Sequence, residues 1–273
     1  APDNNPTGHN TLVIAEANHP TEDSHTTNTS QINGLDGLIS LREENGLQWI
    51  ELDGSAVYGA NPPQIGGYKP YYLDDEQPPG WLKFFHRHLL PISGGHYVVI
   101  DLFKLRDDRE ASTVQEYWHV RQNASPPDPE SCNLGNAQDH VNVSLNGLSE
   151  VQLNAVCSML DKGRLAESIG RINGISLHPG SFSDGGDVTF VNRINQIDQF
   201  RRLKWSSDIP QSEGMRVFVL SAATAMEELP LVELSLAPCN EGYCAEINVG
   251  VNEYHIEFEE QGDGWEITPS QLQ

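Results

Sequence analysis

The feature of this sequence that most constrains its fold is a long series of short apolar runs, many with a period of two. Such runs, 4 to 10 residues long and rich in Val, Ile, Leu and aromatic residues, predict β-strands rather than helices. We expect strands at 11–14, 47–52, 81–90, 96–103, 113–120, 187–191, 215–220, 231–236, 245–251 and 254–259.

Turn-forming residues separate these runs. The chain contains 24 Gly and 17 Pro, and the stretch Ser93-Gly94-Gly95 is a turn between two expected strands. Many strands with such punctuation predict an all-β fold, an antiparallel two-sheet β-sandwich with many strands. The proline-rich loop 125–130 separates an N-terminal β-sheet region, 1–124, from residues 125–273, which either continue the sandwich or form a second β domain.

One or two short helices are expected within this β fold. In the segment 149–160, the apolar residues at 153, 156, 157 and 160 lie on one helical face, and Ser149 is a suitable N-cap. Residues 164–169 form a possible second helical turn.

The charge balance excludes some classes of protein. The chain has 16 Lys and Arg against 39 Asp and Glu, a formal net charge of −23, so it has no basic surplus for nucleic acid. Its apolar runs are far shorter than the roughly 20 residues of a membrane-spanning helix. Hydrophobic residues nevertheless make up 37% of the chain, enough for a core.

Several features favour a secreted protein, extracellular or periplasmic. The first six residues lack the basic start and apolar core of a signal peptide, and the chain has no initiator Met, so we expect a processed product. Three Asn-X-Ser/Thr sequons, at Asn28, Asn123 and Asn142, are candidate glycosylation sites.

Four cysteines, Cys132, Cys157, Cys239 and Cys244, allow three disulfide pairings. Cys239 and Cys244 flank a turn-like stretch, which favours a disulfide at a hairpin end and leaves Cys132 to pair with Cys157. The alternative is a metal site, but the four-residue spacer without a second close pair argues against zinc.

Two parts of the chain resemble a known family. The segment 8–14 contains His-Asn-Thr-Leu, and 86–90, 95–103 and 117–119 follow it in an order similar to the C-terminal β-sandwich domain of heparinase II/III-like polysaccharide lyases. The resemblance covers about residues 8 to 120. It implies β-elimination on a uronic-acid polysaccharide, with a Tyr or His as acid and base.

In that family the catalytic residues belong to a helical toroid, and the sequence has no series of long amphipathic helices. We therefore expect the chain to be inactive by itself and to need a helical partner chain. The His of the family motif binds a structural metal in some members, which makes His9 the candidate metal ligand. Nearby Asp3, His19, Asp23 and His25 are substitute ligands, and a hydrogen-bonding His at a strand start is the alternative.

The triplet at 86–88 is the main candidate for substrate contact. On a strand, His86 and His88 face one side and Arg87 the other. Arg87 and His88 are candidates for binding a substrate carboxylate. The alternative for Arg87 is pairing with Asp101 or Glu116 across the sheet.

Aromatic residues on the strand 113–120 give a second candidate surface. Tyr117 and His119 are expected to stack on sugar rings, with packing of an aromatic strand in the core as the alternative. The Gly/Asp-rich segment 180–187 is either a calcium site through Asp184 and Asp187 or a turn. A structural zinc or calcium ion is therefore the expected cofactor.

Two functions follow. The first is the β-sandwich portion of an extracellular polysaccharide lyase; the alternative is a non-catalytic extracellular β protein, carbohydrate-binding or a self-assembling structural or filament subunit, with glycans. A net charge of −23 opposes an anionic polysaccharide unless local cations reverse the field. Arg87, the nearby His residues and the single basic island, 201–205, are the candidates.

Overall fold

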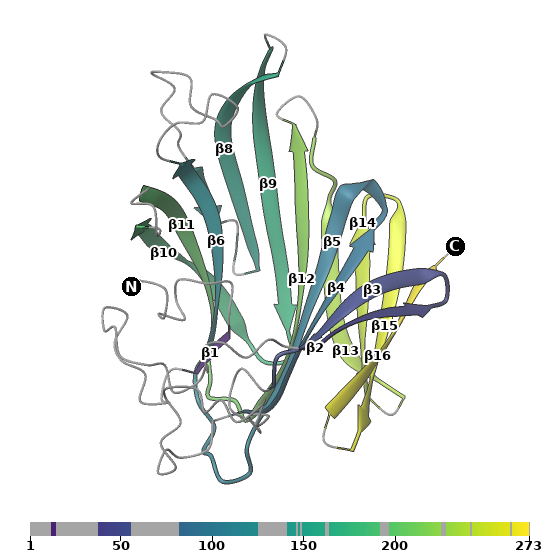
Figure 1. The fold of residues 1–273 in the computed structure, drawn as a ribbon. Coiled ribbons are helices and arrows are strands. Elements are labelled where there is room, and N and C mark those ends of the chain that lie inside the picture. Colours follow the sequence, from purple (N-terminus) through teal and green to yellow (C-terminus); the bar gives the residue numbers. More distant parts are fainter. Residues whose placement is uncertain are drawn as a thin grey trace, which may run out of the picture.

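The computed structural model describes residues 12–14, 38–55, 82–124, 141–145, 147, 149–161, 164–191, 197–224, 228–240, 242–262 and 264–272. These residues form sixteen strands in three antiparallel sheets (Figure 1). The all-β antiparallel sandwich expected from the sequence is confirmed, but with three sheets instead of two.

The largest sheet has eight strands in the order β2-β3-β4-β5-β12-β9-β8-β7. We call it the central sheet. Its strands are β2 (Leu38–Glu44), β3 (Leu47–Asp53), β4 (Leu82–Ile92), β5 (His96–Leu105), β7 (Val141–Leu145), β8 (Glu150–Asp161), β9 (Arg164–Ser176) and β12 (Glu213–Thr224).

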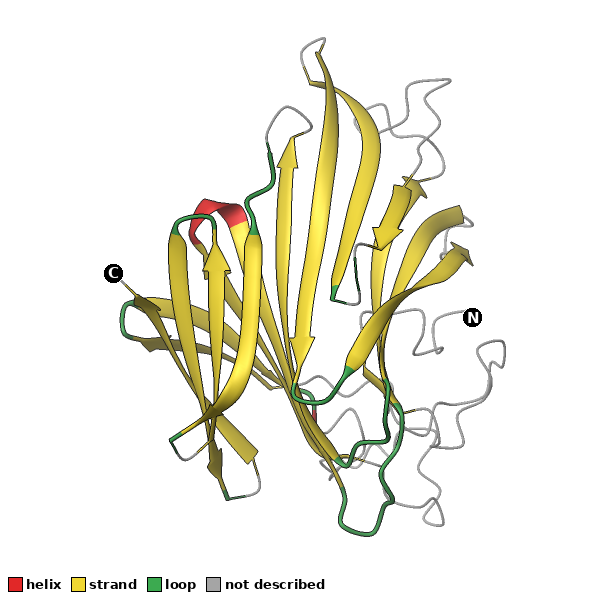
Figure 2. Ribbon diagram, turned by 180° about the vertical axis from the view of Figure 1, so that it is seen from behind, coloured by secondary structure: helices red, strands yellow, loops and turns green. Residues whose placement is uncertain are grey.

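Two four-stranded sheets flank it. One, the C-terminal sheet, runs β13 (Val232–Cys239), β14 (Gly242–Val249), β15 (Asn252–Gln261) and β16 (Gly264–Leu272). The other, the outer sheet, has the order β1 (Leu12–Ile14), β6 (Val114–Ala124), β11 (Ile197–Ser207) and β10 (Gly180–Val191). Figures 1 and 2 show these two sheets on opposite sides of the central one.

The central sheet is apolar on both faces, as strand β5 shows. Val98, Ile100 and Leu102 pack against the C-terminal sheet. Val99 packs in the core shared with the outer sheet, and Phe103 in a smaller core with β1. A strand that is buried on both faces carries a nearly continuous apolar run, which is why 96–103 stands out in the sequence.

The expected helix at 149–160 is wrong, because this segment is strand β8. It forms antiparallel ladders with β7 and β9, pairing Val151 with Ile172. An isolated helix of this length is marginal in water, whereas two neighbouring strands satisfy the backbone on both sides. The second expected helical turn, 164–169, is part of β9.

The described residues contain no helix longer than a 3-10 turn at Ser93–Gly95, the turn expected between β4 and β5. The expected turn at 180–187 is also wrong, because these residues belong to β10, with a register shift between Asp184 and Gly186. Gly186 has φ 75° there, a conformation that glycine adopts without strain. Among all the residues that the structure describes, no helix is long and apolar enough to cross a membrane.

The loop proposed as a domain boundary begins directly after β6, which ends at Ala124. Residues 125–140 lie outside the described residues. Strands from both sides of this loop share sheets: β6 pairs with β11, and β5 pairs with β12.

Candidate functional site

Strand β4 directs its side chains to two different environments. His86 and His88 line a cleft next to the C-terminal sheet, whereas Arg87 bonds to Asp101 and Glu116 on the opposite face. The alternation expected from the sequence is therefore present, and the pairing given as the alternative for Arg87 is formed. Its substrate-binding role stays a prediction.

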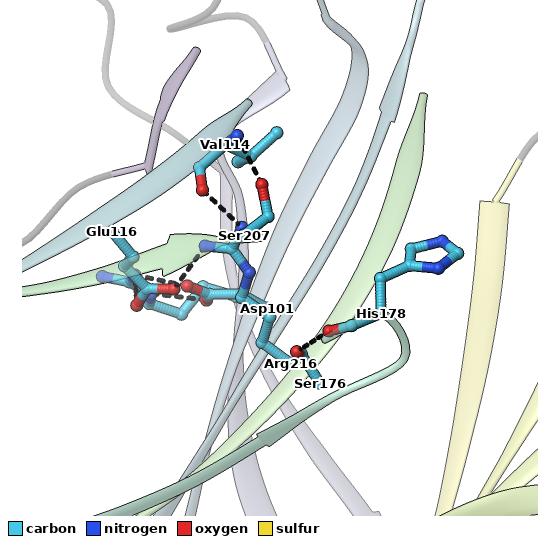
Figure 3. A network of polar contacts seen from close by, with 8 residues as sticks. Asp101, Val114, Glu116, Ser176, His178, Ser207 and Arg216 are labelled. Atoms are coloured by element: carbon cyan, nitrogen blue, oxygen red, sulfur yellow. Dashed lines mark hydrogen bonds and ion pairs between the residues drawn. The ribbon is translucent and has the colours of Figure 1, made fainter. Parts of the chain in front are cut away.

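Arg87 belongs to a buried ionic network between the central and outer sheets. Figure 3 shows three other members of the network, Asp101, Glu116 and Arg216. Arg87, Asp101 and Arg216 lie in one row across β4, β5 and β12, and Glu116 reaches this row from β6. The Arg87 guanidinium donates to Asp101 over 2.7 and 2.5 Å and to Glu116 over 3.0 Å.

The second arginine completes the network. Arg216 donates to Glu116 over 3.4 Å and to the carbonyl oxygen of Val114 over 3.2 Å. The side chains of Asp101, Glu116 and Arg216 are at most 1% exposed. Two carboxylates thus face two guanidinium groups, and the network is balanced in formal charge.

Burial shapes the acid–base behaviour of this network. Desolvation raises the pKa of Glu116 well above its ordinary value, Asp101 adds to the shift, and the two guanidinium groups oppose it. Desolvation also lowers the pKa of Arg216. Its carboxylates accept from the two guanidinium groups, although the Nε–H of Arg216 is buried without a partner among the described residues. We assign the network to joining two sheets.

The cleft on the other face of β4 has the character of a ligand site. It has a volume of about 540 Å³, within the roughly 300–1,000 Å³ typical of small-ligand pockets. It lies where the β2–β3–β4 edge of the central sheet meets β16. The lining residues are Arg42, Glu43, Glu44, Trp49, Glu51, His86, His88, Gln261, Gly264, Trp265, Glu266 and Ile267.

His88 is the most unusual residue in the cleft. It is 3% exposed, and within the described structure neither of its ring nitrogens has a hydrogen-bond partner. Burial lowers its pKa to about 4, so the ring is neutral at physiological pH. Trp49, 5% exposed, also has a buried indole N–H without a partner among the described residues. Buried polar groups are normally paired, so these atoms favour a ligand-binding role for the cleft.

The rim of the cleft is acidic. Four glutamates and one arginine line it, a formal charge of −3 with neutral histidines. The only arginine among these residues, Arg42, donates to Glu51 over 2.6 Å. Glu43 accepts from Gln48 over 2.8 Å, and Glu44 and Glu266 are exposed.

The other predicted site residues are separated from this cleft. Tyr117 is 1% exposed, and its hydroxyl donates to Gln115 over 2.9 Å. The ring of His119 lies 6.4 Å from that of Phe200 on β11. Both residues are in β6, and their substrate-binding role stays a prediction. His9 and the substitute ligands at 3, 19, 23 and 25 lie outside the described residues.

The basic island 201–205 is part of β11, and its two arginines bond within the fold. Arg201 forms an ion pair with Asp184. Arg202 donates to the carbonyl oxygen of Gly185 over 2.8 Å and stacks over the ring of Tyr117. Asp184, a predicted calcium ligand, therefore already has a cationic partner.

The disulfide between Cys239 and Cys244 is present at the β13–β14 hairpin, as predicted. Cys132 lies outside the described residues, as does the side chain of Cys157. Of the sequons, Asn123 lies in β6 and Asn142 in β7, and Asn28 is outside the described part. Cys244, His255 and Glu257 have their potential metal-ligating atoms within 4.8 Å of one another, but the sulfur is committed to the disulfide.

Sequence reasoning singled out His86 and His88, which line the cleft, but not its other residues. The predicted binding of a substrate carboxylate by His88 stays a prediction. Trp49 was placed on a strand without a role, and no strand was expected at 264–272, which carries Trp265 and Glu266. The period-two pattern of β3 places Trp49 and Glu51 on one face of the strand. This pattern was the signal in the sequence that the two side chains lie at the same site. Nothing local shows that β16 packs beside β2 and β3.

The observed structure is a three-sheet all-β fold with an acidic, aromatic cleft at one edge of its central sheet, and solved structures share this fold. The structure is similar to heparan sulfate lyase HepC from Pedobacter heparinus, with a TM-score of 0.51 and 12% identity, and to a mutant of that enzyme, with 0.52 and 11%. It is also similar to the heparinase III-BT4657 gene product with methylated lysines, with a TM-score of 0.52 and 9% identity.

These similarities cover 97% of this chain but only about 30% of the lyases. The chain thus has the fold of a β domain of heparinase III-like enzymes and spans less than a third of their length. At these identities the likeness concerns the fold alone. No family model and no curated protein sequence matches the chain.

Proposed function

We propose that this chain is the β-sandwich portion of an extracellular polysaccharide lyase, and that it binds glycan while a helical part supplies the catalytic acid and base. The observation that carries this proposal is the fold: 97% of the chain aligns with a segment equal to 31% of heparan sulfate lyase HepC. The lyase activity of HepC makes β-elimination on a uronic-acid polysaccharide the reaction to test.

The described side chains support a binding rather than a catalytic role. β-Elimination needs a base beside the acidic proton and an acid beside the leaving oxygen. The described lining of the cleft includes His86 and His88 but no tyrosine to share the acid and base roles with them. The hydroxyl of Tyr254 bonds to Ser93 in the turn after β4, and that of Tyr117 to Gln115. We therefore expect no elimination by this chain alone.

The extracellular location is supported by one structural feature. The Cys239–Cys244 disulfide is of a kind that persists in oxidising compartments. Secretion and glycosylation at Asn28, Asn123 and Asn142 are part of the proposal, and mass spectrometry of the native protein would detect attached glycans.

Two measurements on the purified chain test the function. Ultraviolet absorbance reports unsaturated products from heparan sulfate, chondroitin and alginate, and we expect no product. Affinity electrophoresis in gels containing these polysaccharides, and in gels containing neutral ones, reports binding, and we expect retardation in at least one gel. Rapid product formation would refute the separation of binding from catalysis, and migration unchanged in every gel would refute the glycan-binding role.

The second candidate is a non-catalytic extracellular protein that retains this fold as a carbohydrate-binding or filament subunit. It is favoured by the net charge of −23, which repels polyanions at long range. Arg87, expected to offset this charge locally, is bonded to two carboxylates. Electron microscopy of the native material separates the two: discrete particles with a helical partner support the lyase, and ordered polymers support the filament.

A further inference from the structure

We infer that the cleft between β3, β4 and β16 binds a sugar unit that carries no acid group, and that it prefers an amino sugar with a free, protonated amine. This inference rests on the proposed glycan-binding function, and it names the chemical class of ligand at one site.

The first argument is the set of unsatisfied polar atoms. Within the described structure, both ring nitrogens of His88 and the indole N–H of Trp49 are buried without partners. A neutral imidazole offers one donor and one acceptor, and an indole offers one donor. A hydroxyl group both donates and accepts, so vicinal sugar hydroxyls match this set.

The second argument is shape and apolar surface. The cleft volume of about 540 Å³ accommodates a small ligand of one or two sugar rings. Trp265 lines the cleft, is partly buried, and is held by Tyr243, whose ring centroid is 5.8 Å away. A fixed aromatic ring gives the C–H face of a sugar a surface on which to pack.

The third argument is charge, and it selects among sugars. The rim carries Glu43, Glu44, Glu51 and Glu266 against Arg42 alone, and Arg42 is already bonded to Glu51. A field of this sign repels the carboxylate of a uronic acid and attracts an ammonium group. The cleft is therefore suited to a different part of a glycan than the acidic unit on which a lyase acts.

The test compares four tetrasaccharides that share a β-1,4 backbone, three of which differ from the cellulose tetramer in one substituent per ring, at C2 or at C6. Calorimetric titration of the full chain at mildly acidic pH and low salt uses chitosan, chitin, cellulose and glucuronan tetrasaccharides. We expect the chitosan tetramer, with its protonated amines, to bind at least about tenfold more tightly than the glucuronan tetramer, and added salt to reduce this preference. Equal or tighter binding of glucuronan, or no binding of any tetramer, would overturn the inference.

Variants connect the preference to this cleft. The double variant Glu44→Gln/Glu266→Gln neutralises two exposed rim carboxylates and should reduce the chitosan preference several-fold. The matched control, Glu233→Gln/Glu253→Gln, makes the same charge change at exposed positions outside the cleft and should retain the preference. Trp265→Ala should weaken all tetramers by about tenfold, with the fold verified by circular dichroism.

The proposed function and this inference can fail separately. If a polysaccharide gel retards the chain but Glu44→Gln/Glu266→Gln keeps the wild-type preference for the chitosan tetramer, the inference fails and the glycan-binding function stands. If no polysaccharide retards the chain and no tetramer binds, both fail.

Discussion

The neutral, buried His88 should make the stability of this protein depend on pH in a way that one substitution removes. Its pKa is lowered to about 4 in the folded protein, chiefly by burial, from an ordinary value of 6.5. The unfolded chain therefore binds the proton more readily. Stability from this residue is present above pH 6.5 and is lost as pH falls from 6.5 toward 4.

The magnitude follows from these two pKa values. Between pH 7 and pH 5, linkage predicts that His88 alone lowers the free energy of unfolding by about 2 kcal/mol, and by about 3 kcal/mol at pH 4. The surrounding charged and titratable groups are Arg42, Glu51, His86, Asp101 and Glu266. These groups are present in wild type and variant alike, so the difference between the two proteins isolates His88.

The assay is urea unfolding at pH 7 and pH 5 for the wild type and for His88→Gln, which is polar and does not titrate. The loss of stability on acidification should be smaller in the variant by about 2 kcal/mol. His178→Gln removes a histidine outside the cleft and should keep the wild-type loss. Equal losses in the wild type and His88→Gln would refute the reasoning that His88 is buried and neutral.

Three further predictions concern stability at neutral pH. Arg216→Met should lower the free energy of unfolding by about 3–5 kcal/mol, because it leaves Glu116 buried with one cation fewer. Adding Glu116→Leu should restore part of this stability, and urea titrations in which the two losses simply add would argue against the network. Reducing the Cys239–Cys244 disulfide, which closes a short loop, should cost about 2 kcal/mol, and an unchanged melting temperature under reductant would contradict this. Gly242→Ala should prevent correct pairing of β14 with β15, because an added Cβ would lie 1.9 Å from the carbonyl oxygen of Phe258; a wild-type urea midpoint would contradict it.

Local patterns in the sequence were enough to predict much of the fold. The spacing of Cys239 and Cys244 placed a disulfide at a hairpin, and the alternation on β4 placed His88 and Arg87 on opposite faces. These features depend on chain geometry within a few residues. The predicted pairing across the sheet holds for Asp101, which lies opposite Arg87 on β5. Glu116 instead reaches Arg87 from β6 of the outer sheet.

What the sequence did not predict depends on contacts between distant segments. The apolar spacing of 149–160 fits a helix, and only pairing with β7 and β9 makes it a strand. The third sheet covers the second face of β5. The nearly continuous apolar run at 96–103 indicates burial on both faces, but it does not identify the distant strands that provide the second layer. The cleft requires β16 to approach β2 and β3 across more than 200 residues of chain.

The position of β12 between β5 and β9 has a consequence for how the chain folds during synthesis. The edge of β5 receives its partner only when β12 has been made, because Leu102 pairs with Met215, roughly 110 residues later in the chain. At a translation rate of about 5–20 residues per second, an apolar strand with an open edge waits roughly 6–20 s. A nascent chain of this kind is exposed to wrong strand pairing throughout that interval, so a holding chaperone would raise its folding yield most when it acts before β12 emerges.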